Sequence, residues 1–159
     1  MPLLTGRAAA AAWAAEHRAA GRVVVFTNGV FDVLHPGHTR YLGEARSHGD
    51  VLIVGVNSDR SVRALAKGPD RPLTPAHERA EILAALRAVD AVVIFDEETP
   101  RAIVAAVQPD VLVKGADWAA DAIVGRDVVE ARGGRVVRIA LAPGYSTTAI
   151  VARARAAGG

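Results

Sequence analysis

Short apolar and β-branched runs alternate along the chain with longer stretches of helical pattern. The apolar runs predict five strands, at 23–27, 51–56, 91–95, 110–114 and 136–139. The helical patterns predict helices at about 8–19, 38–48, 58–66, 75–88, 100–107, 126–132 and 147–157. The strands are nearly all apolar, as expected when helices cover both faces of a parallel sheet. This alternation predicts one Rossmann-like α/β domain over residues 1–159, with a core at about 22–155.

The composition narrows the class of protein. With 159 residues the chain has the size of one domain. It has no cysteine, which excludes disulfides, thiolate zinc sites and cysteine nucleophiles. A net charge of +2 and only two Trp, two Tyr and three Phe disfavour a nucleic-acid partner. Apolar runs fall short of the ~18 residues of a membrane span, so we expect a cytoplasmic protein with no membrane partner.

Polar segments, three of them with glycine, follow four of the five predicted strands. Because the carboxyl ends of parallel strands meet at one edge of the sheet, these segments are expected to form the site. They are residues 27–38, 57–59, 114–118 and 144–148. The chain lacks a P-loop, a G-x-G-x-x-G fingerprint, a nucleophile elbow and a zinc-protease helix, which excludes the chemistry of those motifs.

The sequence His35-Pro36-Gly37-His38 leads into the second predicted helix. A helix N-terminus attracts phosphate, and Gly37 lets a phosphate approach the backbone closely. Two imidazoles three residues apart can hold that phosphate and stabilise charge developing on a leaving group. A metal pair is the alternative, but no third ligand is evident, and we predict no metal site. Two unrelated histidines near a helix cap are the plainest interpretation.

Two further segments allow two interpretations each. Residues 146–148, Ser-Thr-Thr, begin the last helix either as an ordinary N-cap or as a second anion cradle. The segment 67–72 is predicted to be an exposed, mobile loop, whose basic residues are either solvated or close over a triphosphate. Arg79 and Arg87 lie eight apart on one predicted helix, so they are expected to share a face as surface charges. Trp118 is interpreted as a core or partner contact rather than a platform for a base.

Taken together, the motifs have a familiar form. Residues 28–32 (Asn-Gly-Val-Phe-Asp) with the histidine motif, and residues 146–150 (Ser-Thr-Thr-Ala-Ile), resemble the two phosphate signatures of the cytidylyltransferase-like nucleotidyltransferases. Within that superfamily the chain is similar to the D-glycero-β-D-manno-heptose 1-phosphate adenylyltransferases over about residues 22–155. The segments that carry this similarity are 26–29, 40–42, 54–59, 67–69, 71–72, 95–100, 110–115 and 144–148.

The resemblance implies a fold, an activity and partners. It implies a five-stranded parallel sheet of order 3-2-1-4-5, Mg²⁺ accompanying ATP, and a homodimer. The implied reaction transfers AMP from ATP to a heptose 1-phosphate and releases ADP-heptose and pyrophosphate, within carbohydrate or lipopolysaccharide metabolism. One alternative is a cytidylyltransferase for a small phosphorylated alcohol such as glycerol 3-phosphate, which Leu141 weakens because such relatives carry Arg there. Another is a nucleotide-sensing domain without turnover.

The resemblance also implies roles for single residues. His35, His38 and Lys67 are the catalytic residues that it indicates. The nucleotide is assigned to Thr27, Asn28, Gly29, Phe31, Gly37, Asn57, Arg87, Lys114, Gly115, Tyr145, Ser146, Thr147 and Thr148. The acceptor is assigned to Asp32, Arg40 and Asp117. The chain departs from many relatives by Val30 in place of Cys, and by Ala116 and Trp118 in place of Gly and Tyr.

Overall fold

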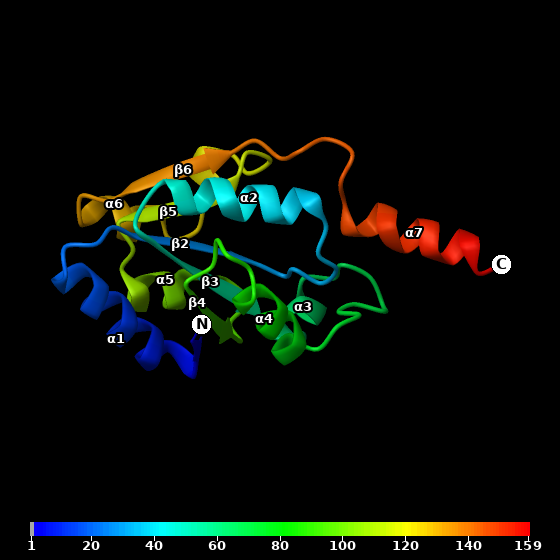
Figure 1. Ribbon diagram of the computed structural model, residues 1–159, viewed down its shortest axis with the longest axis horizontal. Helices are drawn as coiled ribbons and strands as arrows, with labels where there is room; N and C mark the ends of the chain where they lie inside the picture. The colour runs from blue at the N-terminus through cyan, green and yellow to red at the C-terminus, as the bar shows by residue number, and fades with distance from the viewer. Residues whose placement is uncertain (1) are drawn as a thin grey trace.

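A parallel sheet forms the centre of the computed structural model, which describes residues 2–159 (Figure 1). Its six strands run in the order β1-β4-β3-β2-β5-β6, and every neighbouring pair is parallel. The strands are β1 (Leu3–Leu4), β2 (Val24–Gly29), β3 (Val51–Asn57), β4 (Ala91–Phe95), β5 (Val111–Gly115) and β6 (Arg135–Ile139).

The predicted α/β fold is confirmed, and the number of strands is wrong by one. The five predicted strands lie in the order β4-β3-β2-β5-β6, which is the implied order 3-2-1-4-5. The sixth strand, β1, adds to the free edge of β4, with Leu3 beside Val92 and Leu4 beside Val93. Two residues are too short a run to show an apolar pattern, so no pattern along the chain marks this strand.

Helices cover both faces of the sheet (Figure 1). They are α1 (Gly6–Ala19), α2 (Pro36–Ser47), α3 (Asp59–Ala64), α4 (Ala76–Ala84), α5 (Arg101–Val107), the 3₁₀ helix η1 (Ala120–Ala122), α6 (Arg126–Ala131) and α7 (Thr147–Ala157). Alternate strand residues enter two separate cores, as the pleat requires. Val24 and Phe26 pack with α1, α5 and α6. Val25 and Val54 pack with α2 and α4 on the other face.

Helix α4 ends earlier than predicted, and this changes the position of one candidate residue. The apolar pattern extends to about residue 88, but the helix stops at Ala84 and the chain continues in turns. The turns bring fully buried Val89 into the core and let the Asp90 N–H donate to the Leu52 carbonyl before β4 begins. Arg87 therefore does not share a helix face with Arg79.

Helix α7 is the most weakly packed helix, and Figure 1 shows it projecting away from the sheet. None of its residues, all of them described by the structure, is buried. Its first turn is held by the Ser146 hydroxyl, which accepts from the Ala149 N–H, and by Thr147, whose hydroxyl donates to the Val33 carbonyl at 3.1 Å. Across residues 2–159, the helices are all too short or too polar to cross a membrane.

Candidate active site

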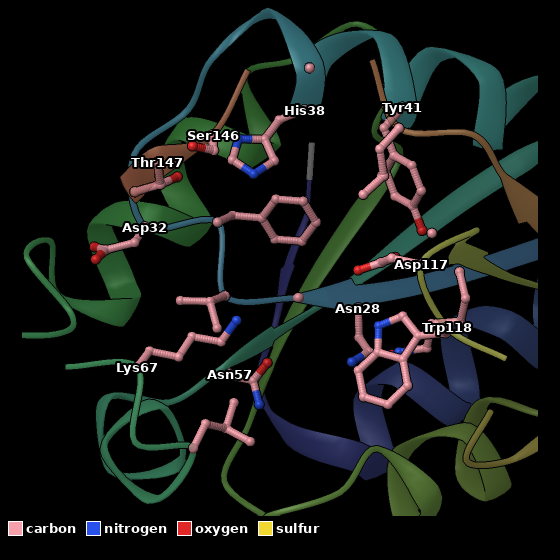
Figure 2. Close-up of a pocket in the computed structure, with 18 of the residues that line it drawn as sticks. Asn28, Asp32, His38, Tyr41, Asn57, Lys67, Asp117, Trp118, Ser146 and Thr147 are labelled. Atoms are coloured by element: carbon pink, nitrogen blue, oxygen red, sulfur yellow. The ribbon is translucent and has the colours of Figure 1, made fainter. Parts of the chain in front are cut away.

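A cleft of about 740 Å³ opens where β2, β3 and β5 end (Figure 2). This volume lies within the range of small-molecule sites. Most of the residues singled out from the sequence line it. They are Asn28, Gly29, Phe31, Asp32, His35, Gly37, His38, Asn57, Lys67, Lys114, Gly115, Asp117, Tyr145, Ser146, Thr147 and Thr148. The polar segments at the strand ends therefore meet at one edge of the sheet, as expected, and they form this cleft.

Thr27, Arg40 and Arg87 do not line the cleft. Thr27 is fully buried beneath it, where its hydroxyl donates to the Val113 carbonyl at 2.9 Å and accepts from the Tyr41 hydroxyl at 2.8 Å. Arg40 is exposed, and its guanidinium lies 5.2 Å from the centre of the Tyr145 ring. Arg87 is exposed in the turn after α4. These three side chains therefore lie outside the lining of the cleft.

His35 and His38 form a stacked pair at the start of α2. Their ring centres are 3.8 Å apart with an angle of 21° between the planes. His35 is the N-cap of the helix in extended conformation, and its carbonyl accepts from the His38 N–H. Both Nδ1 atoms are buried, and within residues 2–159 neither has a hydrogen-bond partner. Each neutral ring therefore has its Nε2 edge as the one available to a ligand.

The two imidazoles are held in the neutral form. Burial lowers the pKa of His35 below its ordinary value. Burial, and to a lesser extent the nearby His35, lower the pKa of His38 to about 4. At neutral pH the two rings are therefore uncharged, and they offer hydrogen-bonding groups to an anion.

Gly37 and Phe31 give this pair its shape. A Cβ at Gly37 would lie 2.8 Å from the His35 ring and 3.0 Å from Tyr145 Cβ, so only glycine leaves room for the His35 ring and Tyr145 where they stand. Phe31 adopts φ +51° and packs edge-on against His38 at 5.4 Å between ring centres. A bulky residue in the left-handed region is strained, and such strain is found where structure holds a functional side chain.

The N-terminus of α7 lies at the same end of the cleft as the histidine pair. The Ser146 hydroxyl acts as the predicted N-cap, and Thr147 bonds to Val33. Thr148 is exposed at the cleft. Free amides and hydroxyls at a helix N-terminus attract anions, so the N-cap and the anion cradle are compatible here. Figure 2 shows Ser146, Thr147 and His38 at the same end of the cleft.

Asn28, Asp117 and Trp118 lie at the other end of the cleft (Figure 2). Lys114 Nζ donates to Asn28 Oδ1 at 2.5 Å and lies 5.9 Å from the centre of the Trp118 ring. Burial lowers the pKa of Lys114 to about 8, and the charge of Asp117 opposes that shift. Trp118 is 51% exposed and lines the cleft, so its interpretation as a core residue is wrong. This end presents an aromatic face, a cation and a carboxylate.

The carboxylate of Asp32 is occupied by the protein itself. It accepts from Arg71, at 3.0 Å, and from the Leu73 and Thr74 N–H groups, at 2.9 Å each. Its side chain is 2% exposed. The geometry argues against Asp32 as an acceptor-binding residue, and of the three residues assigned to that role only Asp117 reaches the cleft with a side chain not already used in this way.

Lys67 lies on the loop between α3 and α4. Figure 2 shows its amine extended into the cleft. Its neighbours Ala66 and Gly68 have φ values of +51° and +126°. The loop also touches α7, where Asp70 pairs with Arg155 at 2.8 Å. The predicted loop is thus present and places Lys67 at the cleft.

Sequence reasoning missed Arg79, whose side chain is fully buried. It donates to the Thr74 and Val30 carbonyls at 2.8 and 2.6 Å and to Asp59 at 2.7 Å. A signal was available, because Arg79 lies three residues after Ala76 and four before Leu83, both on the buried face of α4. Surface charge was the wrong interpretation of this residue.

In the part of the chain from residue 2 to residue 159, no group of three His, Asp or Glu side chains is placed to hold a metal ion. Magnesium is commonly bound through substrate phosphates together with one or two carboxylates and waters. Asp117 is a carboxylate of the cleft lining and is the kind of group that such an ion would need beside the phosphates.

Comparison with known proteins places this site in a family. Residues 26–153 match the family described as Cytidylyltransferase-like. The chain is 57% identical over 136 residues to the bifunctional protein HldE of Hyphomonas neptunium, covering 86% of this chain and 28% of that protein. It is 52% identical over 157 residues to the bifunctional protein HldE of Gluconacetobacter diazotrophicus, covering 99% and 32%. The chain thus spans about a third or less of the length of these relatives.

Solved structures agree. The lipopolysaccharide core biosynthesis protein from Thermoplasma volcanium GSS1 is 30% identical with a TM-score of 0.64, covering 77% of this chain and 98% of that one. A protein with unknown function from Archaeoglobus fulgidus has a TM-score of 0.56 at 22% identity, which shows a shared fold alone.

Proposed function

The chain belongs to the cytidylyltransferase-like family and is a nucleotidyltransferase. We propose that it transfers AMP from ATP to a heptose 1-phosphate. The products are ADP-heptose and pyrophosphate. One observation carries the proposal: a single cleft joins a neutral histidine pair, a helix N-terminus with hydroxyls, and a loop lysine. These are groups for binding and neutralising a triphosphate, and they leave the other end of the cleft for the uncharged parts of the substrates.

The reaction is an in-line displacement at the α-phosphorus. An oxygen of the sugar phosphate forms the new P–O bond while the bond from the α-phosphorus to the bridging oxygen breaks, and pyrophosphate leaves with that electron pair. The histidine pair donates hydrogen bonds to the phosphate oxygens on which charge develops. Lys67 neutralises charge on the α-phosphate and the leaving pyrophosphate, and the α7 N-terminus binds the β- and γ-phosphates.

The heptose assignment rests on the relatives, and the chemistry of the cleft supports it. A heptose has many hydroxyls, and Asp117 and Asn57 offer a carboxylate and an amide at the strand ends. Asn57 already donates from its amide nitrogen to Ser61, so its oxygen is the atom suited to accept from a ligand. A site built to pair hydroxyls rejects analogues that lack them, because its own polar groups are then left unpaired.

A matrix of nucleoside triphosphates and phosphorylated acceptors, read as pyrophosphate release with Mg²⁺, tests the proposal. We expect the highest kcat/KM for ATP with heptose 1-phosphate, about 10³-fold above CTP with glycerol 3-phosphate. A higher value for the second pair would assign the chain to the cytidylyltransferases instead. ATP binding without pyrophosphate release in any combination would leave a nucleotide-sensing domain. Light scattering on the same preparation measures the homodimer that the resemblance implies.

The chemistry of the product indicates which class of reaction would use it. A nucleotide-activated heptose is a donor for glycosyl transfer, and the relative from Thermoplasma volcanium is described as a lipopolysaccharide core biosynthesis protein. We propose that the product feeds such a surface glycan. Glycosyl transfer from the purified product to an acceptor glycan checks this step.

A further inference from the structure

We propose that Asp32 is a positioning residue, which fixes the end of the Lys67 loop against the segment that carries the histidine pair. The proposal rests on the proposed function, in which Lys67 acts on the triphosphate. It replaces the role in acceptor binding that the sequence predicted for Asp32. Figure 2 shows the Asp32 side chain pointing away from the centre of the cleft, while the Lys67 amine points into it.

The carboxylate of Asp32 is saturated with donors from one short stretch of chain. Arg71, Leu73 and Thr74 supply four contacts of 2.9–3.0 Å to its two oxygens. Burial pushes the pKa of Asp32 up, but the hydrogen bonds from Leu73, Thr74 and Arg71 outweigh it and hold the pKa below its usual value. The group is therefore a charged, buried anchor, and hydrogen bonds to a charged acceptor are stronger than neutral ones.

A second buried side chain joins the same two segments. Arg79 donates to the Val30 carbonyl on one side and to the Thr74 carbonyl on the other. Its remaining nitrogen pairs with Asp59, the first residue of α3. The start of α3 and the end of the loop that follows it are thus both tied to the turn that precedes the histidine motif.

Between these anchors the loop is loosely held. Residues 66–70 are exposed, and Lys67 lies between two residues in the left-handed region. The contact at its tip, Asp70 with Arg155, joins side chains that are 63% and 68% exposed. Such pairs contribute about 0–1 kcal/mol. Lys67 is four residues from Arg71, so its Cα stays within about 14 Å of the anchored Cα.

This arrangement limits how far Lys67 can move from the histidine pair, and therefore from the reacting phosphate. Asp32 lies three residues before His35, so the same short segment anchors the loop and carries the histidine pair. When Asp32 releases Leu73 and Thr74, Lys67 gains freedom without any change to the residues that touch the triphosphate. The expected consequence is a lower rate at saturation, with substrate binding little altered.

A double-mutant cycle tests the coupling. We expect Asp32→Asn and Lys67→Ala each to lower kcat, on the order of 10-fold and 10²-fold, and the double variant to lie within about 3-fold of Lys67→Ala alone. KM for the sugar phosphate is expected to change less than about 3-fold in Asp32→Asn. The matched control is Asp127→Asn, which removes an exposed carboxylate that accepts from Arg101 at 2.7–2.8 Å and does not line the cleft. Its kcat is expected to stay within 2-fold.

Two kinetic outcomes would overturn the proposal. Independent losses that multiply in the double variant would show that Asp32 does not act through Lys67. A sugar-phosphate KM raised tenfold or more, with kcat unchanged, would restore the role in acceptor binding.

Hydrogen exchange provides a readout that needs no turnover. The Leu73 and Thr74 amides are expected to exchange at least 10-fold faster in Asp32→Asn, while the amides of β2 and β3 keep their protection. Unchanged exchange at Leu73 and Thr74 would contradict the anchor. If Asp32→Asn lost protection throughout, Arg71→Ala takes its place: faster exchange confined to 66–74 supports the anchor, and unchanged exchange there overturns it. Failure of the proposed function is seen separately, as a wild-type protein that releases no pyrophosphate.

Discussion

The two walls of the phosphate end of the cleft are built in opposite ways. The wall from β2 to α2 is packed and cross-linked: His35 stacks on His38, Asp32 is saturated with donors, and fully buried Arg79 supports the turn. The wall formed by the loop at 66–70 and by α7 has exposed side chains, no buried residue in the helix, and one exposed ion pair at the loop tip.

The difference separates two requirements of the proposed reaction. Groups that stabilise developing charge are most effective when they are held in place before the substrate arrives. Groups that cover a triphosphate have to let it enter and let pyrophosphate leave, and such motions often limit the rate. The packed wall meets the first requirement and the loose wall meets the second.

The largest effect is expected at the packed wall, on activity. His38→Ala or His35→Ala should lower kcat on the order of 10²–10³, because loss of a preorganised donor has that effect in comparable sites. Pyrophosphate release at saturating substrates measures it, and circular dichroism confirms the fold of each variant. A folded variant within a few-fold of the wild-type rate would remove the histidine pair from the mechanism.

Stability gives the next contrast. Arg79→Met leaves the Val30 and Thr74 carbonyls and Asp59 without their donor, at a cost of about 3 kcal/mol in the free energy of unfolding. Urea denaturation measures the loss. The control is Arg87→Met, which replaces an exposed arginine eight residues further along the chain. It should change the free energy of unfolding by less than about 0.5 kcal/mol. Equal losses in the two variants would contradict the buried network.

Acid titration tests the protonation state of the His35–His38 pair. NMR of His38 should give a pKa of about 4, and in His35→Ala that pKa should rise because one of its two causes is removed. Since the folded pKa lies below the ordinary 6.5, the unfolded chain takes up a proton first as the pH falls. The free energy of unfolding should therefore fall between pH 6.5 and 4 and be unaffected by His38 above that window. A pKa near 6.5 in the native protein would contradict the burial of the pair.

The smallest effect is expected at the loose wall. Arg155→Ala breaks the exposed pair with Asp70 and should change the free energy of unfolding by less than about 1 kcal/mol. Limited proteolysis near residues 66–70 should become faster, because the tip of the loop loses its contact with α7. A large loss of stability here would show that the two walls are more alike than their exposure indicates.

Local patterns predicted the elements and failed where a partner is distant in the sequence. The five longer strands and the Ser146 cap follow from apolar runs and a capping residue, which act within a few positions, whereas the strand order was implied by the family resemblance. The role of Asp32 depends on donors about 40 residues away, and nothing beside Asp32 in the chain marks it as an anchor. Arg40 follows the histidine motif closely, yet the helix turns it outward to Tyr145.

Helix α7 is attached mainly by its first turn, with the exposed Arg155–Asp70 pair beyond it, and this has a mechanical consequence. Eleven residues of helix extend about 16 Å from Thr147. A rotation of roughly 10° about that attachment displaces the far end by about 3 Å, while Thr147 itself hardly moves. Small adjustments of the anion-binding turn are thereby magnified into travel of the C-terminal end, and a spectroscopic label at Gly159 would register occupancy of the cleft from outside it.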